Sequence, residues 1–369
     1  MWNRIGALII KELLATLRDK RARVVLIGPP LVQMFIFSFA ATLEVKNVSL
    51  AIYNEDNGKP AYELVQRFRG SRTFSNIRML HATREIRQVI DAGEVLAVVH
   101  IPQDFSRKLY AGRSPEVQLI LDGRSSNTAQ IVQGYLSRIV DGFNHDVGAL
   151  RGAPPPQSQI VTRHWFNPNL EYTWYTVPSL VGLLTMIIGV VITALSVARE
   201  RELGTFDQLL VSPLTPFEIL IGKTVPSLLI AGTDGTLILL IGIYAFRIPF
   251  NGSLVALYVS MFFFLAAIIG IGLFISSLAR TQQQAFLGTF TFAVPAVLLS
   301  GFATPIDNMP GWLQPVTLLD PLRHFMTVVR GIFLKALPPD FVFANTWPMA
   351  AIAAVTLTAA ALLFNRRLE

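Results

Sequence analysis

Residues 198–226 read ARERELGTFDQLLVSPLTPFEILIGKTVP and stand between two long apolar segments. A stretch with this many charges is not stable in hydrocarbon, so we expect a loop or short helix in water at a membrane surface. Within it, Phe206, Leu209 and Leu210 have the three- and four-residue spacing that places side chains on one face of a helix. Ser212-Pro213 ends that helix, because proline disfavours helical backbone.

Two interpretations of this amphipathic helix are available. By itself it would be a solvated loop helix lying on lipid headgroups. However, the order R-E-R-E-x-G-T-x-D-Q-L-L-x-S-P-L over residues 199–214 closely resembles the intracellular loop of permease subunits in type-2 ATP-binding-cassette (ABC) exporters. In that family the loop forms a coupling helix, which sits in a cleft of a separate ATPase subunit and carries its motion to the membrane helices.

The resemblance implies a role in coupling to the ATPase for Arg199, Glu200, Arg201, Glu202, Gly204, Thr205, Phe206, Gln208 and Leu209. As a hypothesis, either Glu200 and Glu202 or Arg199 and Arg201 pair with opposite charges on the ATPase, while Phe206 and Leu209 dock into its groove. The resemblance also implies that ATP-Mg is bound by the partner ATPase subunits, so no cofactor is expected in this chain.

Composition supports a membrane protein. The chain is 52% hydrophobic and only 15% charged, with a mean hydropathy of +0.49. Its formal charge of +7 does not indicate nucleic-acid binding, because the basic residues cluster at the ends of apolar segments, where they contact anionic lipid. The absence of cysteine excludes thiolate metal sites and disulfides, and the five scattered histidines make a metal site unexpected.

Hydropathy and charge predict six membrane spans and both termini in the cytoplasm. The resemblance implies location in a bacterial inner membrane. Residues 1–22 form an interfacial amphipathic helix, and 198–223 the cytoplasmic loop. A cleaved signal peptide is the competing interpretation of the first apolar run, but its length favours a retained anchor. The spans are 24–43, 174–197, 224–246, 254–278, 285–299 and 347–364.

Residues 44–172 have the composition of a soluble domain and are expected outside the cytoplasm, between spans one and two. The predicted strands are 48–53, 77–80, 95–101 and 117–121; the predicted helices are 60–69, 83–92 with Thr83 as N-cap, 103–111 and 127–150. This alternation indicates an α/β domain, and the prolines at 154–156 an extended linker. The turn 122–127 is either a phosphate-binding turn or, as we favour, a plain turn before a helix.

Between spans five and six, residues 300–341 are moderately apolar yet contain Pro305, Pro310, Pro315 and Pro321. This density of proline favours a re-entrant hairpin that enters the outer leaflet and packs on protein. The pattern S-G-x-x-x-P-x-x-x-M-P at 300–310, followed by P-L-x-x-F and V-R-G-I-F-L-K, is again similar to the exporter family.

Two motifs could carry chemistry. Gly222-Lys223-Thr224 looks like the end of a phosphate loop, but Phe217 stands where that loop needs glycine, so no nucleotide site is expected. Asp234 is an ionisable residue inside the third span. It either lines the transport path or a helix interface, or is a neutral or hydrogen-bonded structural residue. No catalytic arrangement is visible, so the chain is not expected to be an enzyme.

The sequence therefore predicts a multi-pass α-helical membrane protein: a permease subunit that exports a drug-like or lipid-like substrate. By resemblance its partners are ABC ATPase subunits, a second permease copy or a paralogue, membrane lipids and, in related exporters, a periplasmic membrane-fusion adaptor with an outer-membrane channel. The rival is a membrane-anchored ligand receptor or assembly protein with a periplasmic sensing domain. An ion-driven transporter is disfavoured, because Asp234 alone would serve as a buried relay.

Overall fold

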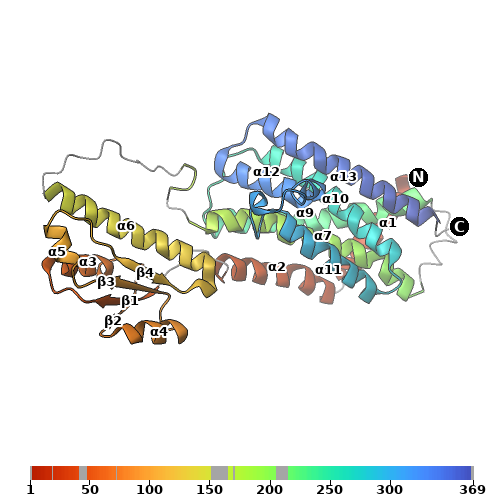
Figure 1. Ribbon diagram of the computed structural model, residues 1–369. Helices are drawn as coiled ribbons and strands as arrows, with labels where there is room; N and C mark the ends of the chain where they lie inside the picture. The colour runs from red at the N-terminus through yellow and green to blue at the C-terminus, as the bar shows by residue number, and fades with distance from the viewer. Residues whose placement is uncertain are drawn as a thin grey trace. The chain divides into compact units, whose positions relative to one another are not determined.

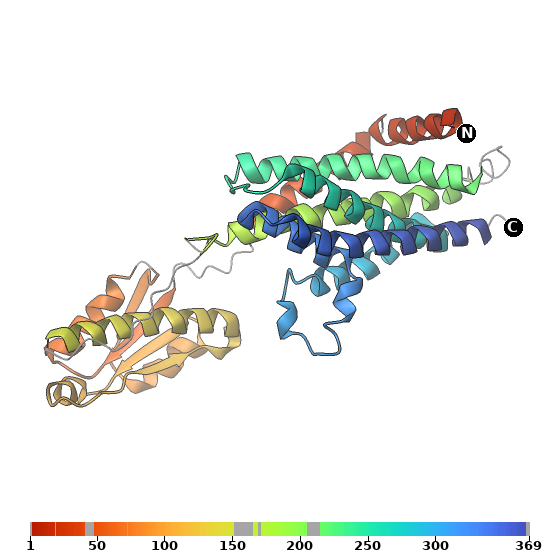
Figure 2. The ribbon, with the colours of Figure 1, turned by 90° about the horizontal axis from the view of Figure 1, so that it is seen from above.

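The computed structural model describes residues 2–18, 20–40, 48–71, 73–150, 165–168, 171–204 and 215–366. The chain divides into two compact units, one of residues 42–162 and the other of residues 1–41 with 163–369 (Figures 1 and 2). Each unit has its own hydrophobic core.

The unit 42–162 is an α/β domain. In chain order its elements are β1 (Ser49–Asn54), α3 (Lys59–Arg69), β2 (Asn76–Leu80), α4 (Thr83–Asp91), β3 (Ala97–Ile101), α5 (Phe105–Tyr110), β4 (Gln118–Leu121), η1 (Gly123–Ser125) and α6 (Ser126–Leu150). The strand order is β2-β1-β3-β4. Strand β1 pairs in parallel with β2 and β3, while β4 is antiparallel to β3. The predicted strands and helices are thus confirmed to within a few residues.

Alternate residues of the strands pack on opposite faces of this sheet. Leu50 and Ile52 pack with helices α3, α5 and α6, whereas Ala51 and Tyr53 pack with α4 (Figure 1). Both faces of β1 are therefore covered, which explains why its central residues Leu50–Tyr53 are apolar on both faces.

Two local predictions can be compared with the structure. Thr83 was predicted to be an N-cap, but the N-cap is Ala82; Thr83 is already helical and its hydroxyl bonds to the hydroxyl of Tyr53. The turn that begins at Asp122 is a 3-10 turn leading into α6. The Arg124 guanidinium donates to the Asp122 carboxylate at 2.7 Å and lowers its pKa. This internal pair supports the plain turn over a phosphate site.

The second unit is helical. Its elements are α1 (Trp2–Arg18), α2 (Lys20–Ala40), α7 (Thr173–Glu202), α9 (Pro216–Tyr244), α10 (Leu254–Leu278), α11 (Gln282–Leu299), η2 (Ile306–Asn308), η3 (Val316–Leu319), α12 (Pro321–Lys335) and α13 (Pro339–Arg366). Helix α7 is the central one, since it contacts α2, α9, α10, α11 and α12 (Figures 1 and 2). Its buried face is almost entirely apolar or small.

Small residues let these helices approach closely. A Cβ at Gly272 of α10 would lie 1.8 Å from Thr193 Oγ1 of α7, and one at Gly270 would lie 2.2 Å from Thr356 Oγ1 of α13. The hydroxyls of Ser260 and Thr346 bond between α10 and α13 at 2.7 Å. Small residues and interhelical hydroxyl bonds are typical of helix packing in membranes, where hydrophobic burial does not favour one helix contact over another.

Among the described residues, four helices are long and apolar enough to cross a membrane: 173–202, 217–244, 254–278 and 339–364. They correspond to predicted spans two, three, four and six. The other two predicted spans fall on α2, whose apolar part is the shorter Leu26–Phe39, and on α11, which opens with three glutamines. The six-span topology therefore stays a prediction.

The structure also places several boundaries differently from the sequence analysis. Helix α7 continues through the charged residues to Glu202, and α9 begins at Pro216, so both helices extend into the predicted loop 198–223. Helix α13 begins at Pro339, inside the predicted re-entrant region 300–341. Within that region, α12 packs on α7 and α10; Phe325 stacks on Phe264 with ring centroids 4.4 Å apart.

Candidate functional site

The predicted coupling residues divide between a described helix end and residues outside the described part of the chain. Arg199, Glu200, Arg201 and Glu202 form the last turn of α7. Gly204 then adopts a positive φ of 68°, which glycine tolerates without a steric penalty, and so ends the helix. Thr205, Phe206, Gln208 and Leu209, with the predicted amphipathic helix, lie outside the described residues.

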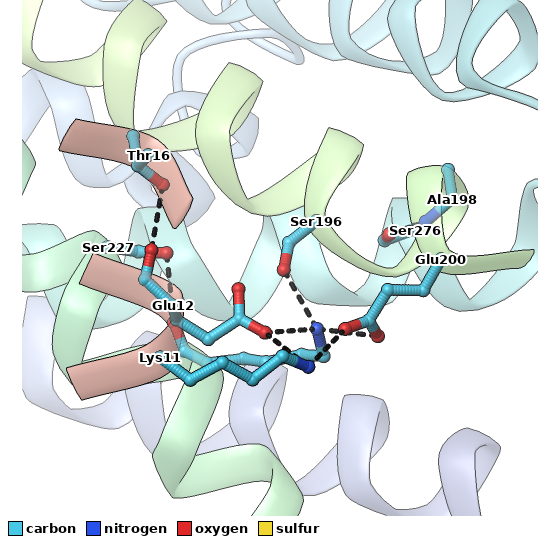
Figure 3. A network of polar contacts seen from close by, with 9 residues as sticks. Lys11, Glu12, Thr16, Ser196, Ala198, Glu200, Ser227 and Ser276 are labelled. Carbon is cyan, nitrogen blue, oxygen red and sulfur yellow. Dashed lines mark hydrogen bonds and ion pairs between the residues drawn. The ribbon is translucent and has the colours of Figure 1, made fainter. Parts of the chain in front are cut away.

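At the end of α7 a buried lysine joins three helices. Lys223 of α9 has a side chain only 2% exposed, and its Nζ lies 2.8 Å from Glu200 Oε2 of α7 and 3.4 Å from Glu12 Oε1 of α1. The same ammonium donates to Ser196 Oγ of α7 at 3.1 Å. In Figure 3 the labelled side chains of Glu12, Ser196 and Glu200 point toward one another. Lys11, whose Nζ is 3.7 Å from Glu200 Oε1, completes what we call the Lys223 network: Lys11, Glu12, Ser196, Glu200 and Lys223.

The charges in the Lys223 network balance. Two ammonium groups face two carboxylates, and the Glu200 and Glu12 side chains are only 13% and 19% exposed. A buried ammonium is costly unless it is paired and hydrogen-bonded, and removing one partner leaves the remaining charge uncompensated. The network therefore holds α1, α7 and α9 together, and we expect the loss of Lys223 or of one of the two carboxylates to be costly.

The absence of a side chain at Gly222 lets α1 pack closely against α9, so that Glu12 can reach Lys223. A Cβ on Gly222 would lie 2.2 Å from Leu8 Cδ2, so only glycine lets the buried Leu8 of α1 pack against α9. One turn earlier, Thr215 and Glu218 form a capping box that starts the helix, with Pro216 as its first residue. Gly222-Lys223-Thr224 is thus helical, with its glycine used for packing and its lysine for ion pairing.

The last turn of α7 is also bonded to α10 and α11. Arg201 donates to the carbonyls of Ser277 and Ala279 at 3.0 and 2.9 Å, where a cation is favoured by the C-terminal end of α10. Glu202 accepts hydrogen bonds from the backbone and side chain of Gln282 at 3.0 and 3.1 Å, at the N-terminus of α11. The end of α7 is consequently tied to α1, α9, α10 and α11.

These contacts place several chain segments at one end of the helical unit. The ends of α7 and α10 and the starts of α9 and α11 meet there. Figures 1 and 2 show that α1 begins and α13 ends at the same end of the unit. The charged stretch recognised in the sequence therefore stands where most helices of the unit meet.

Sequence reasoning missed the Lys223 network. It placed Lys223 at the end of the predicted cytoplasmic loop and in a rejected phosphate-loop motif, and it treated residues 1–22 as an interfacial amphipathic helix. Two signals were available. Thr215-x-x-Glu218 matches the capping-box pattern, which starts the helix before Lys223. Lys223 also stands in a mostly apolar helix, where an ionisable side chain needs a partner.

Asp234 lies near the middle of α9. It is 8% exposed, and its Oδ2 is buried with no hydrogen-bond partner among the described residues. The adjacent Gly235 faces Thr185 of α7 and Met261 of α10, so this part of α9 forms a tight helix interface. The part of the chain that the structure describes contains no group of three or more residues suited to holding a metal ion.

Comparison with known proteins agrees with the architecture. The family model described as "ABC-2 family transporter protein" matches residues 24–362. The chain is 48% identical over 368 residues to "Probable multidrug ABC transporter permease YbhR" of Escherichia coli strain K12, covering 100% of both chains. It is 30% identical to "Probable multidrug ABC transporter permease YbhS" of the same strain, covering 100% of this chain and 98% of the relative. It is 29% identical to "Inner membrane transport permease YhhJ" of Escherichia coli strain K12, covering 97% of this chain and 96% of the relative.

The family model includes the apolar helices, the α/β unit and the charged end of α7, so the match spans both units of the fold. An integral membrane protein with these helices and relatives is a permease, the membrane component of an ABC transporter. The chain therefore belongs to the ABC-2 family of transporter permeases.

Proposed function

We propose that this chain is the membrane-spanning permease subunit of an ATP-driven exporter that moves a drug-like or lipid-like substrate out of the cytoplasm or the inner leaflet. Relatives named multidrug ABC transporter permeases support this proposal. Asp234, inside α9, either lines the transport path or stabilises the helix interface near Thr185 and Met261.

The observation that carries the coupling mechanism is the Lys223 network together with the bonds of Arg201 and Glu202. In the sequence, the predicted contact segment follows Gly204 directly, and the helix end before it is bonded to α1, α9, α10 and α11. An ATPase that moves this segment would act on all of these helices through short polar contacts, rather than bend one helix.

This arrangement refines the predicted division of labour. Glu200, Arg201 and Glu202 already use their charged groups on Lys223, on the end of α10 and on Gln282. We therefore assign contact with the ATPase chiefly to Thr205, Phe206, Gln208 and Leu209. The helix end at Arg199–Glu202 transmits the motion, and Gly204 provides the turn between these two parts.

The proposed topology has six spans, with the charged end of the helical unit and both termini in the cytoplasm and residues 44–172 outside it, in a bacterial inner membrane. ATP-Mg is bound by the partner ATPase, and this chain holds no cofactor. A second permease copy or a paralogue completes the path; a periplasmic adaptor and an outer-membrane channel extend it.

The experiment is purification of the tagged chain from its native membrane in mild detergent after crosslinking. We expect an ABC-type ATPase to be retained in near-equal amount, and Phe206→Ala with Leu209→Ala to release it. Phe217→Ala is the matched control, because Phe217 is 61% exposed at the start of α9 yet outside the proposed contact. If the chain comes away alone although the ATPase is expressed, the exporter proposal fails and a receptor or assembly protein replaces it.

A further inference from the structure

Arg330 of α12 is a half-buried arginine held against α7. Its Nε donates to Ser179 Oγ at 2.6 Å, and its Cζ lies 4.0 Å from the centroid of the Tyr175 ring. One terminal nitrogen faces Met326 Sδ at 3.8 Å. The guanidinium is therefore positioned by a hydroxyl, an aromatic face and a thioether, none of which carries a charge.

Its charge is not compensated within the described part of the chain. No ion pair there includes Arg330, in contrast with Lys223, which has two carboxylates. A guanidinium carries five N–H donors, and the neutral contacts above use only part of them. Moving a cation away from water without a counter-ion is costly, so a partly buried arginine in this setting is best stabilised by an anion.

The neighbouring groups hold the guanidinium ready for such an anion. The Tyr175 hydroxyl donates to the carbonyl of Gly301 at 3.0 Å, which fixes the ring that supports Arg330. Tyr172 lies next to it, with ring centroids 5.8 Å apart. Arginine stacked on an aromatic ring keeps its edge available, and that edge matches the paired oxygens of a phosphate or carboxylate.

The location suits the head group of an amphiphile. Ser179 is near the start of α7 and Glu200 near its end, so Arg330 lies roughly 30 Å along the helix axis from the Lys223 network, at 1.5 Å per residue. That separation is about the thickness of a bilayer's hydrocarbon core. In the proposed topology Arg330 is therefore near the outer boundary, where charged head groups lie.

We propose that Arg330, positioned by Ser179 and Tyr175, binds the phosphate or carboxylate head group of an anionic amphiphile. Such a molecule is available as a bilayer lipid or as exported substrate. Only the second source depends on the proposed export function.

The primary test is binding of radiolabelled dodecyl phosphate to the purified full-length chain in an uncharged maltoside detergent. We expect Arg330→Gln to weaken binding about tenfold or more, since a charge-assisted hydrogen bond contributes about 1.5–3 kcal/mol. Arg330→Lys should retain part of the affinity. The matched control is Arg323→Gln on the same helix, because Arg323 donates to Gln314 O and Thr317 Oγ1; it should leave binding unchanged.

Equal binding by the native chain and Arg330→Gln would overturn the proposal. Arg330 would then have only the structural role of connecting α12 to α7. If Arg330→Gln does not fold, Tyr175→Leu keeps the arginine and removes its support, and we expect it to weaken binding severalfold. For the native chain, dodecyl phosphate must also raise the unfolding temperature more than dodecanol does; no difference would refute an anion site.

Vesicles distinguish the two sources. If the anion is a bilayer lipid, adding phosphatidylglycerol to phosphatidylcholine vesicles should stabilise the native chain and not Arg330→Gln. If it is substrate, Arg330→Gln should lose ATP-driven export of an anionic amphiphile and keep that of an uncharged one. A failure to observe any ATP-driven export would refute the proposed function, yet the detergent binding measurement would still decide whether Arg330 holds an anion.

Discussion

Replacing Lys223 with methionine tests whether the Lys223 network holds the charged end of the helices together. Methionine keeps the length of the side chain but removes the ammonium that lies 2.8 Å from Glu200 and 3.4 Å from Glu12. Two carboxylates that are less than one-fifth exposed then face each other, with the ammonium of Lys11 nearby. Removing one partner of a buried ion pair costs about 3–5 kcal/mol, and the remaining Lys11 favours the lower figure, about 3 kcal/mol.

The assay is unfolding of the purified chain in mild detergent, titrated with a denaturing detergent and followed by tryptophan fluorescence. Lys20→Met is the matched control, because Lys20 is exposed at the start of α2; we expect it to change the free energy of unfolding by less than about 0.5 kcal/mol. Glu200→Gln added to Lys223→Met should recover part of the loss, since it removes one of the uncompensated charges.

A double-mutant cycle of Lys223→Met and Glu200→Gln makes the test quantitative. Residues in direct contact show interaction free energies of about 0.5–3 kcal/mol, and we expect the upper half of that range. If Lys223→Met is as stable as Lys20→Met and the cycle shows no interaction, then the lysine is not paired as described. The proposed rigid connection between α1, α7 and α9 would then be wrong.

Three further predictions concern packing and the α/β unit. Gly222→Ala should loosen α1 from α9 and expose α1 to proteolysis, whereas Gly6→Ala, where nothing lies within 4 Å of the added Cβ, should not. Gly270→Ala should lower the free energy of unfolding by about 1–3 kcal/mol, because its Cβ would clash with Thr356 and with backbone of α13; thermal unfolding no different from the native chain would contradict the packing. Burial acts to raise the pKa of Asp56, but hydrogen bonds from two backbone N–H groups outweigh burial, so the pKa is lowered from 3.8. Stability of the α/β unit should therefore be lost as pH falls through the folded pKa of Asp56. Hydrogen exchange on the full chain should show this loss, and Asp56→Asn should make it smaller.

The elements of the α/β unit were predictable because they depend on local pattern. The run from Leu50 to Tyr53 carries apolar side chains on both faces, as a strand covered on both faces requires, and the structure places a strand there. The N-cap at Thr83 was predicted wrongly. A threonine at the start of a helix is often the N-cap, but here Thr83 is already in α4 and its hydroxyl bonds to Tyr53 of strand β1. That bond depends on how α4 packs against β1, and the local sequence around Thr83 carries no information about this packing.

Sequence alone determined that the chain enters a membrane, that an α/β unit interrupts its helices, and that residues 199–214 resemble a coupling loop, because hydropathy, periodicity and a short motif are properties of neighbouring residues. Only the tertiary structure decided what the charges of that loop do. Glu12 and Lys223 are 211 residues apart and meet because Gly222 lets Leu8 approach α9. A charged residue in an apolar segment indicates from the sequence alone that it needs a partner. Which residue becomes that partner is determined by the packing of the helices, and this packing depends on contacts between residues far apart in the chain.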